Sequence, residues 1–211
     1  MKFLKKYTLL ILLLLLTGNY AYAVDSWKFK VFYDDSEIGE HEFLRTHDNG
    51  GQKLTITADF NIDILFINVY SYKHRNVEKW NGQCLISINA LTDDNGEIFE
   101  VNGKAEEKIF KLKTKYNEEN IDGCVKTFSY WDNSILDSDT LLNSQTGELV
   151  DVDISFVANE EILVRNKLVS TRRYNLKTED FTIDLWYSDN GEWVALNSIT
   201  SDGAKLHYKI Q

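Results

Sequence analysis

The chain of 211 residues predicts an all-β fold, an open or closed antiparallel β-barrel of roughly ten to twelve strands with one short helix. Apolar and polar residues alternate with period two in most segments, which is typical of strands with one buried face. Asn-Gly and Gly-Gly pairs separate many of these segments and indicate hairpin turns. The sequence contains no proline, so glycine, asparagine, aspartate and serine must make the turns.

The first 23 residues have the three parts of a secretory signal peptide. Three lysines precede an apolar run of eight residues, Leu9–Leu16, and small residues follow, so we expect cleavage after Ala23. A membrane-spanning helix needs about 20 apolar residues, so the run favours a cleaved signal over an anchor. We therefore expect a periplasmic or secreted protein without a transmembrane span in the mature chain, and a single β-barrel domain over residues 24–211.

Charge excludes some classes of partner. Removal of residues 1–23 takes away three lysines and no acid, so the formal net charge changes from −10 to −13. Such a surface repels phosphate backbones, so we expect no nucleic-acid partner and no simple electrostatic docking on anionic lipid.

The two cysteines, Cys84 and Cys124, both lie in the exported part of the chain. In an oxidising compartment such a pair most often forms a disulfide, and neither cysteine has the CxxC spacing of a redox site. Closure of a loop of about 40 residues would contribute on the order of 4 kcal/mol. We expect a structural bridge.

The first half of the mature chain predicts a series of antiparallel strands. Residues 27–33 alternate cleanly, a more polar strand follows at 38–47, and Leu54, Ile56, Ala58 and Phe60 mark the next. The expected strands that follow cover residues 62–72, 84–90, 98–101 and 108–112, with a hairpin at 94–96.

The second half is less regular. We expect a surface loop at residues 113–123, a strand at 125–131, and strands near 148–157 and 161–174. The one helical segment is predicted at residues 133–143, because Asp132 or Asn133 can cap it and four aliphatic residues would form an apolar side.

Residues 181–210 predict a three-stranded meander. Asn190-Gly191 favours a two-residue type I′ turn that places Tyr187 opposite Val194. A three-residue loop at Ser201-Asp202-Gly203, with a left-handed glycine, puts Leu206, Tyr208 and Ile210 on the same apolar face. The other face is expected to carry Trp186 and Trp193.

Several blocks resemble one exported bacterial family, domain of unknown function family 6134, which we relate to the 3108 family. They are Tyr70-x-Tyr72-x-His74, Glu78-x-Trp80-x-Gly82-x-Cys84, Cys124-x-x-x-Phe128-x-Tyr130-Trp131, Leu141-Leu142-Asn143-x-Gln145-Thr146-Gly147-Glu148, and Asp184-Leu185-Trp186-Tyr187 with the following Gly191. The resemblance implies an open antiparallel β-barrel in the envelope of Gram-negative bacteria. It brings no catalytic residues with it.

No motif in the sequence indicates a metal, a cofactor or a catalytic residue. The four histidines have no recognised metal spacing, and His41 and His47 would lie roughly 20 Å apart on an extended strand. Acid-rich pieces near Asp137 and Asp151 lack the calcium-loop pattern. A hydrolase that uses an unrecognised acidic pair stays open as a third possibility.

The aromatic residues support the leading hypothesis. Tyr70, Tyr72, His74, Trp80 and Trp131 are expected to line a cavity that binds a hydrophobic small molecule or an envelope lipid. The alternative is that these rings only fill the core, and that the chain is an interaction or assembly protein that meets an envelope protein partner through a strand edge or its acidic surface.

Overall fold

The computed structural model describes residues 24–48, 51–64, 67–199 and 203–211, so the predicted signal peptide and most of the turn predicted at Ser201-Asp202-Gly203 lie outside the described residues. Fifteen strands and one 3-10 helix form within them, which exceeds the expected ten to twelve strands. They are β1 (Val24–Tyr33), β2 (Ser36–Asp48), β3 (Gly51–Ile64), β4 (Ile67–Asn81), β5 (Cys84–Asp94), β6 (Glu97–Glu106), β7 (Ile109–Thr114), β8 (Glu118–Asp122), η2 (Asn133–Asp137), β9 (Thr140–Leu142), β10 (Leu149–Asp151), β11 (Asp153–Val164), β12 (Lys167–Lys177), β13 (Thr182–Ser188), β14 (Trp193–Ile199) and β15 (Lys205–Ile210).

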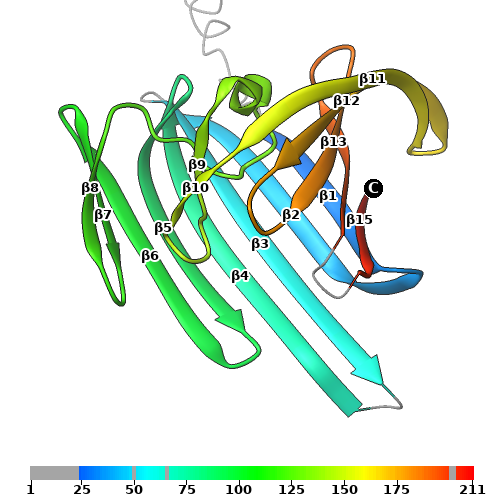
Figure 1. Cartoon of the computed structure of the whole chain (residues 1–211), viewed down its shortest axis with the longest axis horizontal. Helices are drawn as coiled ribbons and strands as arrows, with labels where there is room; N and C mark the ends of the chain where they lie inside the picture. The colour runs from blue at the N-terminus through cyan, green and yellow to red at the C-terminus, as the bar shows by residue number, and fades with distance from the viewer. Residues whose placement is uncertain (1–23, 49–50, 65–66, 200–202) are drawn as a thin grey trace, which may run out of the picture.

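Thirteen of the strands form one curled antiparallel sheet (Figure 1). Strands pair with their chain neighbours from β1 to β8 and from β11 to β15, and the two runs join where β1 pairs with β15. Within this sheet β8 and β11 each have one neighbour, so the sheet does not close on itself. The predicted fold class is confirmed in its open form.

Residues 124–152, here called the crossing segment, run across the concave face of the sheet (Figure 1). Trp131 packs on Trp27 of β1 and Trp80 of β4, with ring centroids 6.5 and 5.9 Å apart. Tyr130 packs on Trp193 of β14 at 5.2 Å. Because the segment contacts both runs of strands, it fills much of the interior with the chain's own side chains.

The predicted disulfide is present. Cys84, the first residue of β5, is bonded to Cys124 at the start of the crossing segment. Directly after the bridge, the backbone N–H of Leu85 donates to the carbonyl of Val125 at 2.9 Å. The bridge therefore fixes one end of the crossing segment to the sheet.

The meander over residues 181–210 has the predicted apolar face. Leu185 lies opposite Leu196, and Leu196 lies opposite Tyr208. The described end of the second turn also agrees with the prediction, because Gly203 has a left-handed φ of 87°. Period-two alternation was sufficient to place these residues.

The predicted type I′ turn at Asn190-Gly191 is wrong. A type I′ turn needs a positive φ at both residues, and of the two only Gly191 has one, at 82°. Its N–H donates to the carbonyl of Ser188, whose own N–H donates to the carbonyl of Glu192, so the loop has three residues. Tyr187 consequently lies opposite Trp193, with a bulge, and Trp193 packs in the interior instead of on the outer face.

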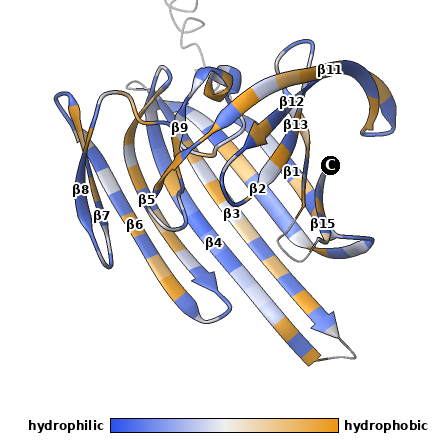
Figure 2. Cartoon of the chain, in the orientation of Figure 1, coloured by the Kyte–Doolittle hydropathy of each residue, from blue (hydrophilic) through white to orange (hydrophobic). Residues whose placement is uncertain are grey.

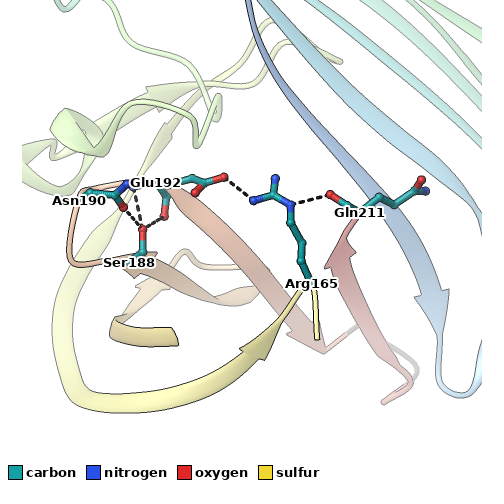
Figure 3. Close-up of polar contacts among 5 residues, drawn as sticks. All are labelled: Arg165, Ser188, Asn190, Glu192 and Gln211. Atoms are coloured by element: carbon teal, nitrogen blue, oxygen red, sulfur yellow. Dashed lines mark hydrogen bonds and ion pairs between the residues drawn. The ribbon is translucent and has the colours of Figure 1, made fainter. Parts of the chain in front are cut away.

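The far end of the β11–β12 hairpin is fastened to residues that flank β14 and β15 (Figure 3). Arg165 donates from Nε to the backbone carbonyl of Gln211 at 2.7 Å and from Nη1 to Oε1 of Glu192 at 3.0 Å. Trp186, on the outer face of β13, donates from Nε1 to Oε1 of Glu160 on this hairpin. The hairpin thus covers Trp186, which is 6% exposed.

The predicted helix at residues 133–143 is shorter than expected. Asp132 accepts from the N–H of Ser134 and caps a 3-10 helix, η2, that ends at Asp137. Leu141 and Leu142 belong instead to β9, which pairs with β10. The aliphatic residues of this segment are buried, but in a strand and not along a helix.

Two neighbouring predictions are also corrected. The expected loop at 113–123 contains the edge strand β8, which pairs with β7 and whose Glu118 forms an ion pair with Lys113. The expected strand at 125–131 is irregular, with a single bridge from Thr127 to Leu142. Every second residue is nevertheless buried, namely Val125, Thr127, Ser129 and Trp131. The period-two pattern therefore predicted burial correctly, although only one bridge forms and no regular strand.

Hydrophobic and hydrophilic residues alternate visibly along the long strands (Figure 2). The apolar members that point to the concave face, with those of the crossing segment, form one large core cluster that includes Phe29, Phe43 and Leu185. In the part of the chain that the structure describes, no helix is long and apolar enough to cross a membrane.

Candidate functional site

A pocket of about 300 Å³ remains where the crossing segment does not fill the interior. Strands β2, β3 and β4 form one wall, and β13, β14 and β15 form the opposite wall. Residues 128–130 and 143–145 of the crossing segment cover it. Phe128, Phe181, Leu196 and Leu206 are among its apolar lining residues.

His41 contributes the least satisfied polar atom of this pocket. Its Nδ1 lies 3.3 Å from the hydroxyl of Tyr208, across the junction of the two runs of strands. Its Nε2 is enclosed and has no hydrogen-bond partner. Burial, helped by the nearby His74, lowers the pKa of His41 to about 3, so the ring is neutral at physiological pH.

His74 lies in the same row of the sheet, because His41 and His74 are both register partners of Ala58 on β3. Its Nδ1 is 2.8 Å from the hydroxyl of Thr92, and both residues are buried. Burial lowers the pKa of His74 to about 4. The pocket therefore holds two neutral imidazoles.

A chain of hydrogen bonds fixes the crossing segment at the edge of the pocket. The hydroxyl of Tyr72 donates to Oε1 of Gln145 at 3.2 Å, and Nε2 of Gln145 donates to Asp94 at 3.0 Å. The hydroxyl of Tyr70 donates to the same carboxylate at 2.8 Å. Burial raises the pKa of Tyr72 well above its usual value, so the phenol stays protonated.

The five residues predicted to line a cavity are divided by the structure. Tyr72 and His74 line the pocket. Tyr70 lies further along the same face of β4 and contacts Asp94. Trp80 and Trp131 pack against each other in the core, and neither lines this pocket.

Glu78 is a buried carboxyl that belongs to one of the quoted family blocks but was not predicted as a site residue. It accepts hydrogen bonds from Nδ2 of Asn76 at 2.8 Å, Nε1 of Trp80 at 3.0 Å and the hydroxyl of Ser129 at 2.9 Å. Burial raises its pKa despite these bonds. Alternation along β4 puts Glu78 on the same face as His74 and Trp80, and this signal was available in the sequence.

Residues of the pocket itself were also missed. His41, Ser129 and Gln145 line the pocket but lie on segments far from Tyr72 in the sequence. His41 and Tyr208 had been placed on strands without a link between them. Only the β1–β15 pairing and the path of the crossing segment bring these residues together.

The lining of the pocket is uncharged. With both imidazoles neutral, none of the described residues that line it carries a charge. Among the described residues, no group of three or more histidine, cysteine or acidic side chains is arranged to hold a metal ion. The lining offers instead apolar walls with a few amide, hydroxyl and imidazole groups.

Residues 29–211 match the family described as domain of unknown function DUF6134. Among solved structures, the chain is similar to the beta-barrel-like protein of domain of unknown function DUF1849 from Brucella abortus, with a TM-score of 0.61 and 8% identity over 90% of this chain and 95% of that one. At this identity the likeness shows the fold alone. No curated protein matches the chain.

Proposed function

Because the chain belongs to the DUF6134 family, whose function is unknown, we propose a function from its pocket: it is an exported protein that binds a small, uncharged hydrophobic molecule. The match over residues 29–211 confirms the family prediction. The relation to the 3108 family stays a prediction. The ligand class that fits is a single acyl chain with a neutral polar head, such as part of an envelope lipid.

The observation that carries this proposal is the unpaired Nε2 of His41 in the wall of an uncharged pocket whose lining combines apolar side chains with hydroxyl, amide and imidazole groups. A buried polar atom without a partner costs about 1–3 kcal/mol. Nδ1 shares its hydrogen bond with Tyr208 in either tautomer, so Nε2 is left as one donor or one acceptor. A hydroxyl group on a ligand can pair with Nε2 in both cases, once the side chains that now enclose this atom move aside.

Volume limits the ligand. A pocket of about 300 Å³ is at the lower end of the range of roughly 300–1,000 Å³ for small-molecule sites. A single chain fits this volume, whereas a lipid with several chains does not. We therefore expect the pocket to hold one chain of a larger lipid or a whole small molecule.

Charge limits the head group. No cation lines the described part of the pocket to pair with a carboxylate, and an unpaired buried charge is costly. An alcohol should therefore bind better than the fatty acid of the same length.

Isothermal titration of the purified protein with 1-decanol and with decanoate at pH 7 tests the proposal. We expect 1-decanol to bind at least about tenfold more tightly, because decanoate must bury its charge. Ser144→Trp should fill the pocket and abolish binding, while Leu163→Trp, on the exposed end of the β11–β12 hairpin, should leave it unchanged. Absence of binding by either ligand would contradict the proposal.

Export is part of the same proposal. The predicted signal peptide and the Cys84–Cys124 bridge both support an oxidising compartment, because cytosolic disulfides are rare. Mass spectrometry of the protein from the periplasmic fraction of an expressing bacterium should give a chain that starts at Val24. An uncleaved N-terminus in the cytosolic fraction would contradict this part.

A second candidate function rests on the open edge of the sheet. β11 has 12 residues and one neighbour in the sheet, and Phe156 and Val157 on it are 54% and 43% exposed. Long edges of this kind pair with strands of other proteins. Cross-linking at β11 to an envelope protein, with an empty pocket, would favour this interaction role over ligand binding.

A further inference from the structure

Another pocket, of about 710 Å³, is lined by Trp27 and Trp131 and is here called the polar pocket. It shares no described lining residue with the pocket of His41. In the crossing segment, Tyr130 lines the pocket of His41, whereas its neighbour Trp131 lines the polar pocket. The polar pocket is therefore a separate candidate site, and an inference from it does not rest on the proposed function.

The wall of the polar pocket is held in place by bonds within the protein. Arg45 donates from Nε and Nη2 to Oδ2 of Asp25, at 3.0 and 2.6 Å. Asp132 caps η2 through its side chain. Oε1 of Glu192 accepts a hydrogen bond from Arg165 at 3.0 Å (Figure 3). Side chains that are fixed in this way lose little conformational freedom when a ligand binds.

The lining of the polar pocket offers both donors and acceptors. A carboxylate can accept several hydrogen bonds and a guanidinium can donate several, so Asp25, Asp132 and Arg45 keep capacity beyond their bonds within the protein. The side-chain amides of Gln52 and Asn133 can donate and accept. Because a hydroxyl group also donates and accepts, a ligand with many hydroxyl groups matches this lining.

Buried atoms of two lining residues have no hydrogen-bond partner among the described residues. Trp131 is 6% exposed, and its Nε1 is a donor without an acceptor. Oε1 of Gln52, on β3, is an acceptor without a donor. Both atoms are enclosed, so a ligand in the polar pocket reaches them once neighbouring side chains move aside. Buried polar groups usually have partners, and a hydroxyl-rich ligand could supply a partner to each of these two atoms.

Charge narrows the class of ligand. Among the described lining residues, three carboxylates stand against one guanidinium, that of Arg45, so an anion would be repelled. This guanidinium lies over the rings of Trp27 and Trp131, 5.3 and 4.9 Å from their centroids. A cationic ligand would therefore find its favoured position over these rings occupied. In the described part of the chain, no three acidic, histidine or cysteine side chains are arranged for a metal ion. The class that fits is a neutral ligand.

We propose that the polar pocket binds a neutral saccharide, whose hydroxyl groups pair with Gln52, Trp131 and the carboxylates of the wall. The volume of about 710 Å³ is within the range of roughly 300–1,000 Å³ for small-molecule sites. The saccharide can be free or can be the head group of a lipid. In both cases the chemistry that the pocket recognises is a neutral ring with several hydroxyl groups.

Saturation-transfer difference NMR of the purified protein with glucose, maltose and octyl glucoside tests the proposal. Transfer to the ring protons of glucose or maltose would identify a free saccharide as the ligand. Transfer to the ring protons of octyl glucoside alone would identify a saccharide that is linked to a lipid. Equimolar citrate or spermidine should not displace the bound saccharide, because each is charged. Transfer to none of the three probes, or displacement by either charged molecule, would overturn the proposal.

A blocking variant locates the saccharide. Asn133→Trp should fill the polar pocket and abolish the transfer, because Asn133 is an exposed residue of its wall. The matched control is Asn120→Trp, at an exposed residue of the edge strand β8, which should leave the transfer unchanged. Circular dichroism and urea denaturation show whether both variants are folded. Saccharide binding that survives in folded Asn133→Trp would overturn the proposal. Titration of this variant with 1-decanol should match the wild type, so the two proposed sites can fail independently.

A second pair of variants separates binding from stability. Gln52→Met removes the unpaired acceptor and keeps a side chain of similar size, so we expect saccharide binding to weaken about fivefold while stability to urea changes little. Gln145→Met is the matched control, because this amide is bonded to both Tyr72 and Asp94. It should lower stability and leave saccharide binding unchanged. The reverse pattern would show that Gln52 serves the fold and not a ligand, and would overturn the proposal.

Discussion

Two aromatic regions face the crossing segment, and in one of them a ring of this segment packs between two rings of the sheet, whereas in the other the rings of the sheet face a pocket. In the first, here called the tryptophan cluster, Trp131 packs between Trp27 and Trp80. In the second, the pocket, Tyr72 and His74 face a volume of about 300 Å³. Both regions lie on the same face of β4, so strand alternation does not distinguish them.

Their buried polar groups also differ. Beside the tryptophan cluster, the buried carboxyl of Glu78 has three donors around it, from Asn76, Trp80 and Ser129, although Nε1 of Trp131 has no partner among the described residues. The described lining of the pocket holds no carboxyl or other charged side chain, and there Nε2 of His41 has no partner. In our proposal, the packed rings and the bonded carboxyl of the first region serve stability, and the uncharged pocket serves binding.

Truncation should give the largest difference between the regions. Trp80→Ala removes a fully packed ring and a donor to Glu78, so we expect a loss of about 3–5 kcal/mol in the free energy of unfolding. Tyr72→Ala, at the pocket, should cost less than half of that and should weaken decanol binding. Urea denaturation of the oxidised protein measures both. Equal losses for the two variants would remove the distinction.

Acid should destabilise the pocket. The folded pKa of His74 is about 4 against an ordinary value of 6.5, so below pH 6.5 the unfolded chain takes up a proton that the folded chain does not. The contribution of His74 is therefore complete above pH 6.5 and is lost as pH falls toward 4, by about 1.4 kcal/mol per pH unit. Between pH 7 and pH 5, the free energy of unfolding of His74→Gln should fall less than that of the wild type. If the free energy of unfolding of both proteins fell equally with pH, this would contradict the prediction.

Acid should act in the opposite direction on the tryptophan cluster. Because burial raises the pKa of Glu78 above 4.5, its stabilising contribution is greatest below the ordinary carboxyl pKa and is lost as pH rises through the folded value. An NMR titration of the Glu78 carboxyl carbon should place its midpoint above 4.5. A midpoint below it would show that the three hydrogen bonds outweigh burial.

A single hydroxyl should give the smallest effect. Tyr72→Phe keeps the ring but removes the hydrogen bond to Gln145, so we expect a loss of about 1 kcal/mol in the free energy of unfolding. Tyr116→Phe, at a residue that is 73% exposed, is the control and should change stability little. If the two variants behave alike, the bond to Gln145 does not hold the crossing segment in place.

Much of the sheet could be predicted because strands obey a local rule. Alternation placed Phe29, Leu54 and Leu185 on buried faces without knowledge of their partners. Turn geometry was less certain. Asn95-Gly96 has a positive φ at both residues, as a type I′ turn requires, whereas Asn190-Gly191 forms a three-residue loop because Ser188 and Glu192 pair across it.

The site could be predicted only in part because it depends on contacts between distant segments. Tyr72 and His74 share a strand, so alternation found them together. Trp131 continues the alternation of the buried residues Val125, Thr127 and Ser129. This alternation does not indicate whether Trp131 borders a cavity or lies in the core. Gln145 reaches the pocket only through the path of the crossing segment, which local sequence does not specify.

A crystal structure of the protein with 1-decanol tests the central claim most directly. We expect the alkyl chain between Phe128 and Leu206 in the pocket, with its hydroxyl within hydrogen-bond distance of Nε2 of His41. Decanol bound elsewhere, or a pocket closed by its own side chains with His41 still unpaired, would contradict the claim that this protein binds a hydrophobic ligand there.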